Sequence, residues 1–417
     1  MSIIVTDALY KRMWIRRRFW KRLIFLTITF AISFYIPVFI FGNLKIPKVV
    51  RLTDLNRCPV CYGISICPEL YSNQIVLEEH RWQDLLFNVK NIYHGYTKSN
   101  RKVILKKLAY DKQLDKFDNN LCKTFNLHSN CTPMDLLNAT NINKKIMDIV
   151  HYNLTRNVSV QPRTGLIFCP YPEGIHDFLK PILNNKIGKQ YKSDLLNVWT
   201  MVNLNAEPII LQILPKSRGW AVPAYAGVCG RLEVVADEGV PLSDLGNIAW
   251  YRKLKIAKQI LEMAMDFTFK HDRYRFYFFD WSADNIVVNE KDQVSYVDLE
   301  DVIILDKYIT PKRDLRNWYQ RYIKDYDENS VGYMFSIDLI CRHHLSDHNI
   351  YSACYVLNGD DKPFLKPVPD QFEKGPFSKL VNQCLYGPDR FKAAILLQRY
   401  ITDLLSKESV SGFGAVR

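Results

Sequence analysis

The sequence lacks the features that mark nucleic-acid-binding proteins and repeat proteins. Its 417 residues contain no zinc finger, no RNA-binding signature and no run of basic residues like a nucleic-acid tail, although the net charge is +13. Seven basic residues precede residue 23 and the others are spread along the chain, so we expect no nucleic-acid partner. No internal repeat and no long low-complexity linker interrupts the chain. With 48% hydrophobic residues, the sequence is that of a folded protein with a large core.

Residues 23–42 contain no charged side chain and are almost entirely apolar. About 20 helical residues, at 1.5 Å per residue, cross a bilayer core of ~30 Å. Because the basic cluster precedes this segment, the positive-inside rule puts the N-terminus in the cytosol and the rest of the chain in the lumen. This pattern favours an uncleaved type II signal-anchor. The alternatives are a signal peptide cleaved near Ala31-Ile32-Ser33 and, third, a buried helix of a soluble protein.

Sequons and cysteines are both typical of a lumenal protein. Four Asn-x-Ser/Thr sequons fall in one short window, at Asn130, Asn138, Asn153 and Asn157. The ten cysteines are an even number, so all of them can pair in an oxidising compartment. We therefore predict a glycosylated, disulfide-bonded domain, with the connectivity of the disulfides left open.

Zinc is the alternative use of these cysteines. The candidate ligand sets are Cys58 with Cys61 and Cys67, and Cys341 with His343, His344 and His348. Neither set has a second pair at the spacing of a zinc finger. The three histidines could also act on a substrate, although packed or surface histidines are the commoner case.

Residues 276–305 contain a predicted β-hairpin, with strands at 286–288 and 294–297, and carry the residues best suited to chemistry. An aromatic run leads into Asp280, Asn285 follows five residues later, and two apolar runs separated by a polar turn end at Asp298. Mg²⁺ prefers oxygen ligands and neutralises the charge of a transferred phosphoryl group. We expect Asn285 and Asp298 to hold the metal and Asp280 to act as the base. The alternative is a surface hairpin whose ends are capped by Asp and Asn.

The spacing of apolar residues predicts the other elements. Residues 85–107 predict a strand, a turn at 94–101 and a second strand that ends at Val103-Ile-Leu-Lys106. The further expectations are a helix at 111–121, helices and loops over 127–204, a strand at 208–214, a strand pair at 225–236, a long helix at 248–269, and helices near 315–326, 334–345 and 390–405.

With these residues in hand, the chain resembles the divergent protein kinase domain family, in its deleted-in-autism branch of secretory-pathway proteins. The resemblance rests on the Asp280, Asn285 and Asp298 set and on these strings: Cys58-Pro-Val-Cys61, Leu86-Phe-Asn-Val-Lys-Asn-Ile-Tyr93, Val103-Ile-Leu-Lys106, Ala226-Gly-Val-Cys-Gly-Arg231, and Asp347-His-Asn349 with Tyr351 and Cys354.

The resemblance implies an α+β, bilobal, protein-kinase-like fold behind the transmembrane helix. The predicted parts are a cytosolic basic tail (1–22), the signal-anchor (23–42), a stem with a cysteine-rich segment (43–84), a small β-rich N-lobe with a glycosylated helical insertion (85–239), and a larger helical C-lobe (240–417). It also implies a location in the Golgi or endoplasmic reticulum membrane, or secretion.

The site residues take their roles from the same resemblance. Lys106 would contact the phosphates of ATP, Asp280 would be the base, and Asn285 and Asp298 would hold Mg²⁺ or Mn²⁺. Glu300 adds a third metal candidate, a carboxylate that would bind the ion or shift its preference towards Mn²⁺. The acceptor would be a hydroxyl group of a secreted protein or of a glycan.

Four departures from the kinase pattern keep other functions open. No Gly-x-Gly-x-x-Gly loop is present, and Gly95 stands alone in its region. Phe278-Phe279 replaces His-Arg before Asp280, and Leu299-Glu300 replaces Phe-Gly after Asp298. Lys106 lacks an assigned acidic partner; Asp115 and Asp118 are available on the helix at 111–121, which contains no Glu. A pseudokinase that acts by binding, or a secreted signalling factor, is therefore the alternative.

Overall fold

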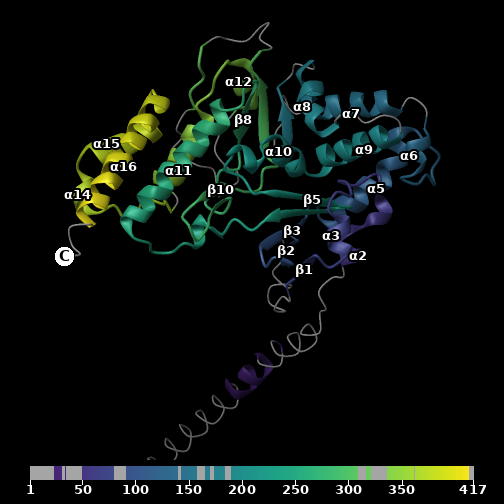
Figure 1. Ribbon diagram of the computed structural model, residues 1–417, viewed down its shortest axis with the longest axis horizontal. Helices are drawn as coiled ribbons and strands as arrows, with labels where there is room; N and C mark the ends of the chain where they lie inside the picture. Colours follow the sequence, from purple (N-terminus) through teal and green to yellow (C-terminus); the bar gives the residue numbers. More distant parts are fainter. Residues whose placement is uncertain are drawn as a thin grey trace, which may run out of the picture.

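The computed structural model describes residues 23–30, 33, 49–78, 91–139, 142–156, 165–169, 173–183, 189–308, 316–320, 336–360 and 362–412. Its architecture is mixed α+β, as predicted (Figure 1). One group of helices runs from α5 to α9 and another contains α11 and α14 to α16. Strands lie between the two groups in this view.

A five-stranded antiparallel sheet has the strand order β1-β2-β3-β6-β5. Its strands are β1 Ile75–Leu77, β2 Ile92–Thr97, β3 Lys102–Lys107, β5 Tyr225–Cys229 and β6 Leu232–Ala236. The strand pair predicted over 225–236 is confirmed. The turn predicted at 94–101 begins later, because β2 continues to Thr97. Short elements pack beside the sheet: α2 Val49–Thr53, η1 Leu55–Arg57 and α3 Cys67–Tyr71.

Gly95 is needed for the contact between β1 and β2. A Cβ atom at this position would lie 2.7 Å from the backbone carbonyl oxygen of Val76, closer than real Cβ contacts. Gly95 pairs with Leu77 in the ladder of these two strands. The glycine therefore allows close approach of two backbones, and this accounts for it without a phosphate-binding loop.

Helices cover the region predicted to be a helical insertion. They are α5 Asp111–Phe125, α6 Asp135–Asn138, α7 Ile142–Arg156, α8 Glu173–Leu183 and α9 Lys189–Leu204. Within this region Leu166–Phe168 forms a strand, β4, that the apolar pattern did not reveal. It pairs in parallel with β11 in the three-stranded sheet β4-β11-β8.

The strand predicted at 208–214 is wrong. Residues Glu207–Ile213 form a helix, α10, in which six of the seven residues are buried. A short, largely apolar run fits a buried strand and a buried helix equally well, so periodicity cannot separate them. Pro208 near the start of the run favours the helix, since proline is well tolerated in the first turn.

The second half of the chain carries the long helix and the predicted hairpin. Helix α11 spans Trp250–Phe269, and its predicted stripe is buried. The strands are β7 Val240–Pro241, β8 Tyr274–Phe278, β9 Ile286–Val288, β10 Val294–Tyr296 and β11 Val302–Asp306. Later helices are α12 Ile337–Arg342, α13 His348–Asn358, α14 Asp370–Glu373, α15 Pro376–Tyr386 and α16 Arg390–Gly412, with short turns η2 Lys216–Arg218 and η3 Leu242–Asp244. Of the helix predicted near 315–326, only 316–320 are described, and they are not helical.

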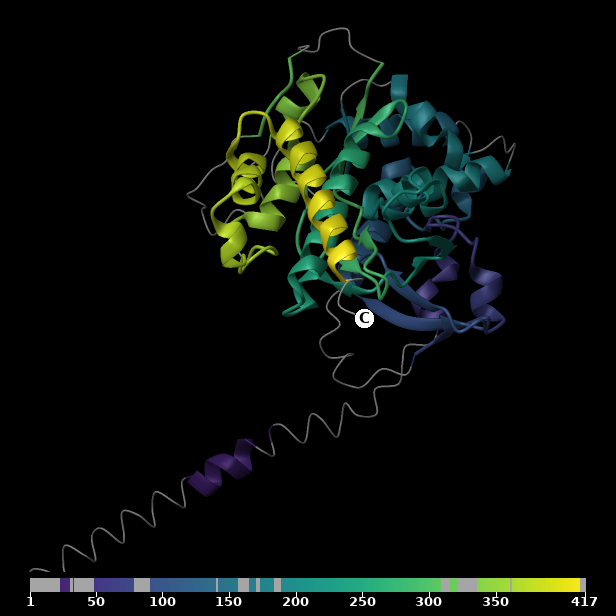
Figure 2. The same ribbon diagram turned by 60° about the vertical axis from the view of Figure 1, so that its left-hand side comes forward.

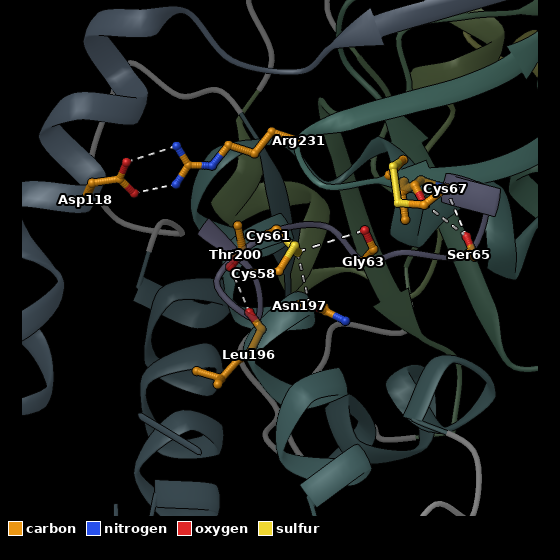
Figure 3. Close-up of a disulfide and its surroundings, with 12 residues drawn as sticks. Cys58, Cys61, Gly63, Ser65, Cys67, Asp118, Leu196, Asn197, Thr200 and Arg231 are labelled. Atoms are coloured by element: carbon orange, nitrogen blue, oxygen red, sulfur yellow. Dashed lines mark hydrogen bonds and ion pairs between the residues drawn. A yellow bond between two sulfur atoms is a disulfide. The ribbon is translucent and has the colours of Figure 1, made fainter. Parts of the chain in front are cut away.

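All ten cysteines are paired, so the disulfide prediction is confirmed and the zinc alternatives are wrong. The pairs are Cys58–Cys61, Cys67–Cys229, Cys122–Cys131, Cys169–Cys341 and Cys354–Cys384. Figure 3 shows the first of these beside α9 and the second where α3 meets the five-stranded sheet. Five disulfides indicate a lumenal or extracellular compartment.

The predicted membrane span lies mostly outside the described residues. Residues 23–30 and Ser33 are helical, and Figure 2 shows this helix apart from the folded body. Its apolar side chains are exposed: Leu23, Ile24, Phe25, Leu26, Ile28 and Phe30. Among the residues with a described structure, no helix is both long enough and apolar enough to span a bilayer. The signal-anchor and the domain boundaries remain predictions.

Candidate functional site

The predicted hairpin is confirmed, and its register fixes the residues at its open end. Ile286 of β9 pairs with Tyr296 of β10. The next residue pair continues the contact, since the Val297 N–H donates to the carbonyl of Asn285 at 2.9 Å. Asp298 follows directly and has a left-handed backbone, with φ +65°. Such a backbone is uncommon outside glycine, although Asp tolerates it, and it turns the chain sharply after the strand.

Asp280 and Asn285 are in direct contact at this end of the hairpin. The Asn285 side-chain N–H donates to the Asp280 carboxylate at 2.7 Å and to the Asp280 carbonyl at 3.0 Å. The hydroxyl of Tyr296 also donates to that carbonyl, at 2.9 Å. Asp280 is exposed whereas Asn285 is buried. The Asp280 side chain is therefore accessible from solvent, while the residues that orient it are fixed in the core.

Lys106 has an acidic partner that the sequence did not identify. Its ammonium donates to both carboxylate oxygens of Glu207, at 2.8 and 2.9 Å. The side chain of Lys106 is 12% exposed and that of Glu207 is fully buried. Burial alone would lower the pKa of Lys106, but the charges of Glu207 and Asp298 outweigh this effect and raise it. The lysine is therefore a permanent cation that joins β3, the start of α10 and the turn after β10.

The two candidate partners of Lys106 on α5, Asp115 and Asp118, do not bind it. Asp118 instead forms an ion pair through both carboxylate oxygens with the buried Arg231 of the β5–β6 turn, as Figure 3 shows. It also lies 3.3 Å from Arg57. Asp115 is exposed. The signal for Glu207 was present in the sequence as Glu-Pro before an apolar run, but that run was interpreted as a strand.

Glu300 lies behind Asp298 in a largely buried position. The side-chain N–H of Asn205 donates to its carboxyl group. Burial, followed by the charges of Asp298 and Asp301, raises the pKa of Glu300 to about 8. Burial also raises the pKa of Asp301 to about 6, although the Gly165 N–H donates to that carboxylate. At neutral pH and without a cation, Glu300 is therefore mostly a neutral acid.

The residues present fit a divalent cation that is bound together with phosphates. Among the described residues no group of three or more His, Cys, Asp or Glu side chains forms a ready-made metal site. Mg²⁺ bound with a nucleotide needs only one or two protein ligands, because phosphates and waters supply the rest. Asp298 can provide a carboxylate. Asn285 donates to Asp280 through its nitrogen, which leaves its side-chain oxygen for the cation.

Helix α13 supports the strand that leads to Asp280. Its first residue, His348, donates from Nε2 to the carbonyl of Phe278 at 2.8 Å, and the Phe278 N–H donates to the Asn349 side chain at 3.2 Å. Asn349 also donates to the Phe276 carbonyl at 2.7 Å and to the Thr268 hydroxyl at 2.9 Å. Both α13 residues are fully buried. His348 is thus packed in the core and cannot act directly on a substrate.

A second buried contact fixes the start of this helix. Asp347 accepts a hydrogen bond from the Arg390 guanidinium at 2.7 Å and from the Gln320 N–H at 2.7 Å. This ion pair joins α13 to α16, and its two side chains are at most 4% exposed. The residues before Asp280 are Phe-Phe rather than His-Arg, so polar groups of α13 provide the support at this position.

Comparison with known proteins identifies relatives of this chain. Residues 198–386 match the family model described as the protein-kinase domain of FAM69. The chain is 28% identical over 383 residues to human Divergent protein kinase domain 2A, across 85% of this chain and 88% of that protein. It is 27% identical to the Xenopus tropicalis protein of the same name, with the same coverage. It is 24% identical to mouse Divergent protein kinase domain 2B, across 69% of each chain. The chain thus carries a divergent kinase-like domain and is similar, along most of its length, to the FAM69/divergent protein kinase domain 2 family.

Proposed function

We propose that the site binds ATP with Mg²⁺ or Mn²⁺ and transfers a phosphoryl group to a hydroxyl of a secreted protein or a glycan. The observation that carries this proposal is the buried ion pair between Lys106 and Glu207, within the field of Asp298. In protein kinases a strand lysine paired with a helix glutamate holds the nucleotide phosphates. The five-stranded sheet with α10 would be the small lobe, and α11 with the elements that follow it the large lobe.

Each residue of the site would have one task. Lys106, held by Glu207, would bind phosphate oxygens of the nucleotide. Asn285 and Asp298 would hold the divalent cation, which neutralises charge on the phosphates when it is bound. Asp280, oriented by Asn285, would accept the proton of the acceptor hydroxyl at its carboxylate, a task that typically contributes ~10²–10⁴-fold to the rate.

We further propose that the domain lies in the lumen of the Golgi or endoplasmic reticulum behind an uncleaved type II anchor, or is secreted. Five disulfides support an oxidising compartment. Two of the sequon asparagines, Asn130 and Asn138, are exposed and so accessible to glycosylation. Asn153 is partly buried and donates to Asn203, and Asn157 lies outside the described residues. The sequence strings that carry the resemblance, such as Cys58-Pro-Val-Cys61 and Ala226-Gly-Val-Cys-Gly-Arg231, support a place in the deleted-in-autism branch.

The test of nucleotide binding is a thermal-shift measurement on the purified full chain with ATP and Mg²⁺ or Mn²⁺. A ligand present at 100 times its dissociation constant stabilises the fold by about 2.7 kcal/mol. We expect this stabilisation in the wild type and its loss in Asp298→Ala. The matched control is Asp115→Ala, which removes an exposed carboxylate outside the site. An equal shift in wild type and Asp298→Ala would contradict the proposal.

A second candidate is a pseudokinase that binds nucleotide without transfer. The connection between β1 and β2, residues 78–91, contains no glycine. Gly95 lies in β2, where it allows the backbones of β1 and β2 to approach closely. The phosphates would therefore lack a glycine-rich loop above them. Phosphate transfer that is lost in Asp280→Ala, while nucleotide-dependent stabilisation is retained, would select the kinase. Stabilisation without transfer to any acceptor would select the pseudokinase.

A further inference from the structure

A second glutamate lies buried beside the Lys106–Glu207 pair. Glu233 of β6 is the direct cross-strand partner of Lys106 in the β3–β6 ladder. Its exposure is 0%. Among the described residues, no N–H or O–H donor bonds to either of its carboxyl oxygens. A buried ionised carboxylate without donors is strongly unfavourable, so this side chain requires an explanation.

Five ionisable groups from different parts of the chain interact electrostatically with Glu233. They are Lys106 of β3, Glu207 of α10, Asp298 after β10, Tyr225 of β5 and Tyr62 after the Cys58–Cys61 disulfide. The hydroxyl of Tyr62 is buried and has no hydrogen-bond partner among the described residues. Lys106 is thus the one cation in this set, and it faces three carboxyl groups.

The ammonium of Lys106 is already committed to Glu207. It contacts both oxygens of that carboxylate, at 2.8 and 2.9 Å. Glu233, the cross-strand partner of Lys106, lies beside the carboxylate that holds the ammonium, and the charge of Glu207 acts on it. Two carboxyl groups can share a hydrogen bond only when one of them is protonated. Because Glu207 accepts both hydrogen bonds of the ammonium and Glu233 accepts none, the proton is assigned to Glu233. Burial, and then the charge of Glu207, accordingly raises the pKa of Glu233 well above its usual range.

We propose that Glu233 is a positioning residue that keeps its proton at neutral pH and donates it to Glu207, which fixes the carboxylate that holds Lys106. This inference rests on the proposed nucleotide site and adds a means of regulation to it. When Glu233 ionises, its carboxylate repels Glu207 and competes for the ammonium of Lys106. The lysine is then drawn away from the nucleotide phosphates, and binding of ATP weakens.

The direction of the pH effect follows from the raised pKa. A carboxyl group whose pKa is higher in the fold than in the unfolded chain contributes stability that is fully present below the unfolded value, near 4.3. That contribution is lost as pH rises towards the folded value. The same ionisation lets Glu233 compete for the ammonium of Lys106. Nucleotide binding should therefore be strong at acidic pH and weaken as pH rises.

The proton can be tested without nucleotide or metal by infrared difference spectroscopy of the full chain. We expect the wild type at neutral pH to show the carbonyl band of a protonated carboxylic acid that Glu233→Gln lacks. Glu290→Gln, which alters an exposed residue of the β9–β10 turn, should retain the band. If the infrared spectra of the wild type and Glu233→Gln do not differ in the carbonyl band of protonated carboxylic acids, the inference is overturned, whether or not ATP binds.

The positioning role is tested by the pH dependence of ATP and Mg²⁺ binding. The amide of Glu233→Gln can still donate to Glu207 but cannot ionise, so its affinity should equal that of the wild type at low pH and stay constant as pH rises. Glu233→Ala lacks the donor, and we expect its dissociation constant to rise about tenfold or more. If Glu233→Gln binds as weakly as Glu233→Ala, or titrates like the wild type, the role is wrong. A Glu233-dependent band in a chain that binds no ATP would overturn the proposed function and leave the proton assignment intact.

Discussion

The two halves of the candidate site differ in how far apart their residues lie in the sequence. Asp280 and Asn285, which share a hydrogen bond, are five residues apart, and a short hairpin places them. Lys106 and Glu207, which form the ion pair, are 101 residues apart, and a sheet and a helix bring them together. Local chain geometry builds the first half, whereas tertiary packing builds the second. The halves meet at Asp298, whose charge acts on Lys106.

The largest effect on stability is expected in the half that depends on packing. Glu207→Ala leaves Lys106 as a buried cation without its partner, and breaking a buried ion pair in this way costs about 3–5 kcal/mol. The free energy of unfolding from urea denaturation measures this cost. The control is Glu262→Ala, which removes an exposed ion pair with Lys258 on α11 and should cost less than about 1 kcal/mol. Equal losses in the two variants would contradict the account.

Support of the hairpin half by α13 is tested by Asn349→Ala. The change leaves the Phe278 N–H and the Phe276 carbonyl without this partner in the core, and unsatisfied buried groups of this kind cost about 1–3 kcal/mol each. Asn358→Ala, on the same helix, removes only an exposed hydrogen bond to Asn382. Urea denaturation should separate the two variants, and a loss in Asn358→Ala as large as that in Asn349→Ala would mean that α13 does not support β8 in this way.

The role assigned to Gly95 is tested by Gly95→Ala. The new methyl group would press on the Val76 carbonyl of the neighbouring strand, and forced packing of this kind costs about 1–3 kcal/mol. Because the glycine serves the β1–β2 contact, the affinity for ATP should remain close to that of the wild type when it is measured well below the melting temperature. A variant with unchanged stability and greatly reduced ATP affinity would instead show that Gly95 contacts phosphates.

The dependence of stability on pH gives a further test. Glu300, with a pKa raised to about 8 by burial, holds a proton in the fold that the unfolded chain releases near pH 4.3. Its contribution to stability is therefore present below that pH and is lost as pH rises to about 8. Between these values the free energy of unfolding should fall more steeply in the wild type than in Glu300→Gln, by about 1.4 kcal/mol per pH unit. Parallel curves from metal-free denaturation would show that Glu300 is already ionised.

The sequence was sufficient to predict the elements whose structure depends on residues close together in the chain. The aromatic strand before Asp280, the hairpin with Asn285 at its open end and the stripe of α11 all follow from short-range patterns, and the structure contains each of them. The even number of cysteines predicted disulfides, but pairs such as Cys67–Cys229, 162 residues apart, depend on how distant segments pack.

The parts that sequence patterns missed are set by tertiary contacts. Five of the seven residues from 207 to 213 are apolar and six of the seven are buried, so the run lacks the periodicity that would have identified a helix. With α10 mistaken for a strand, Glu207 could not be recognised as the partner of Lys106. Asp118 was available in the sequence, yet the buried Arg231 requires that carboxylate. The proton on Glu233 follows only from the cross-strand register and burial.

The account depends on Asp298 joining the two halves around one bound nucleotide. The most direct measurement is calorimetric titration of ATP with Mn²⁺ into the full chain and into Asp298→Asn, which removes the charge and keeps the shape. We predict metal-dependent binding in the wild type that is weakened at least about tenfold in the variant. Binding of equal strength in both proteins, or no binding to the wild type with either Mg²⁺ or Mn²⁺, would contradict the account.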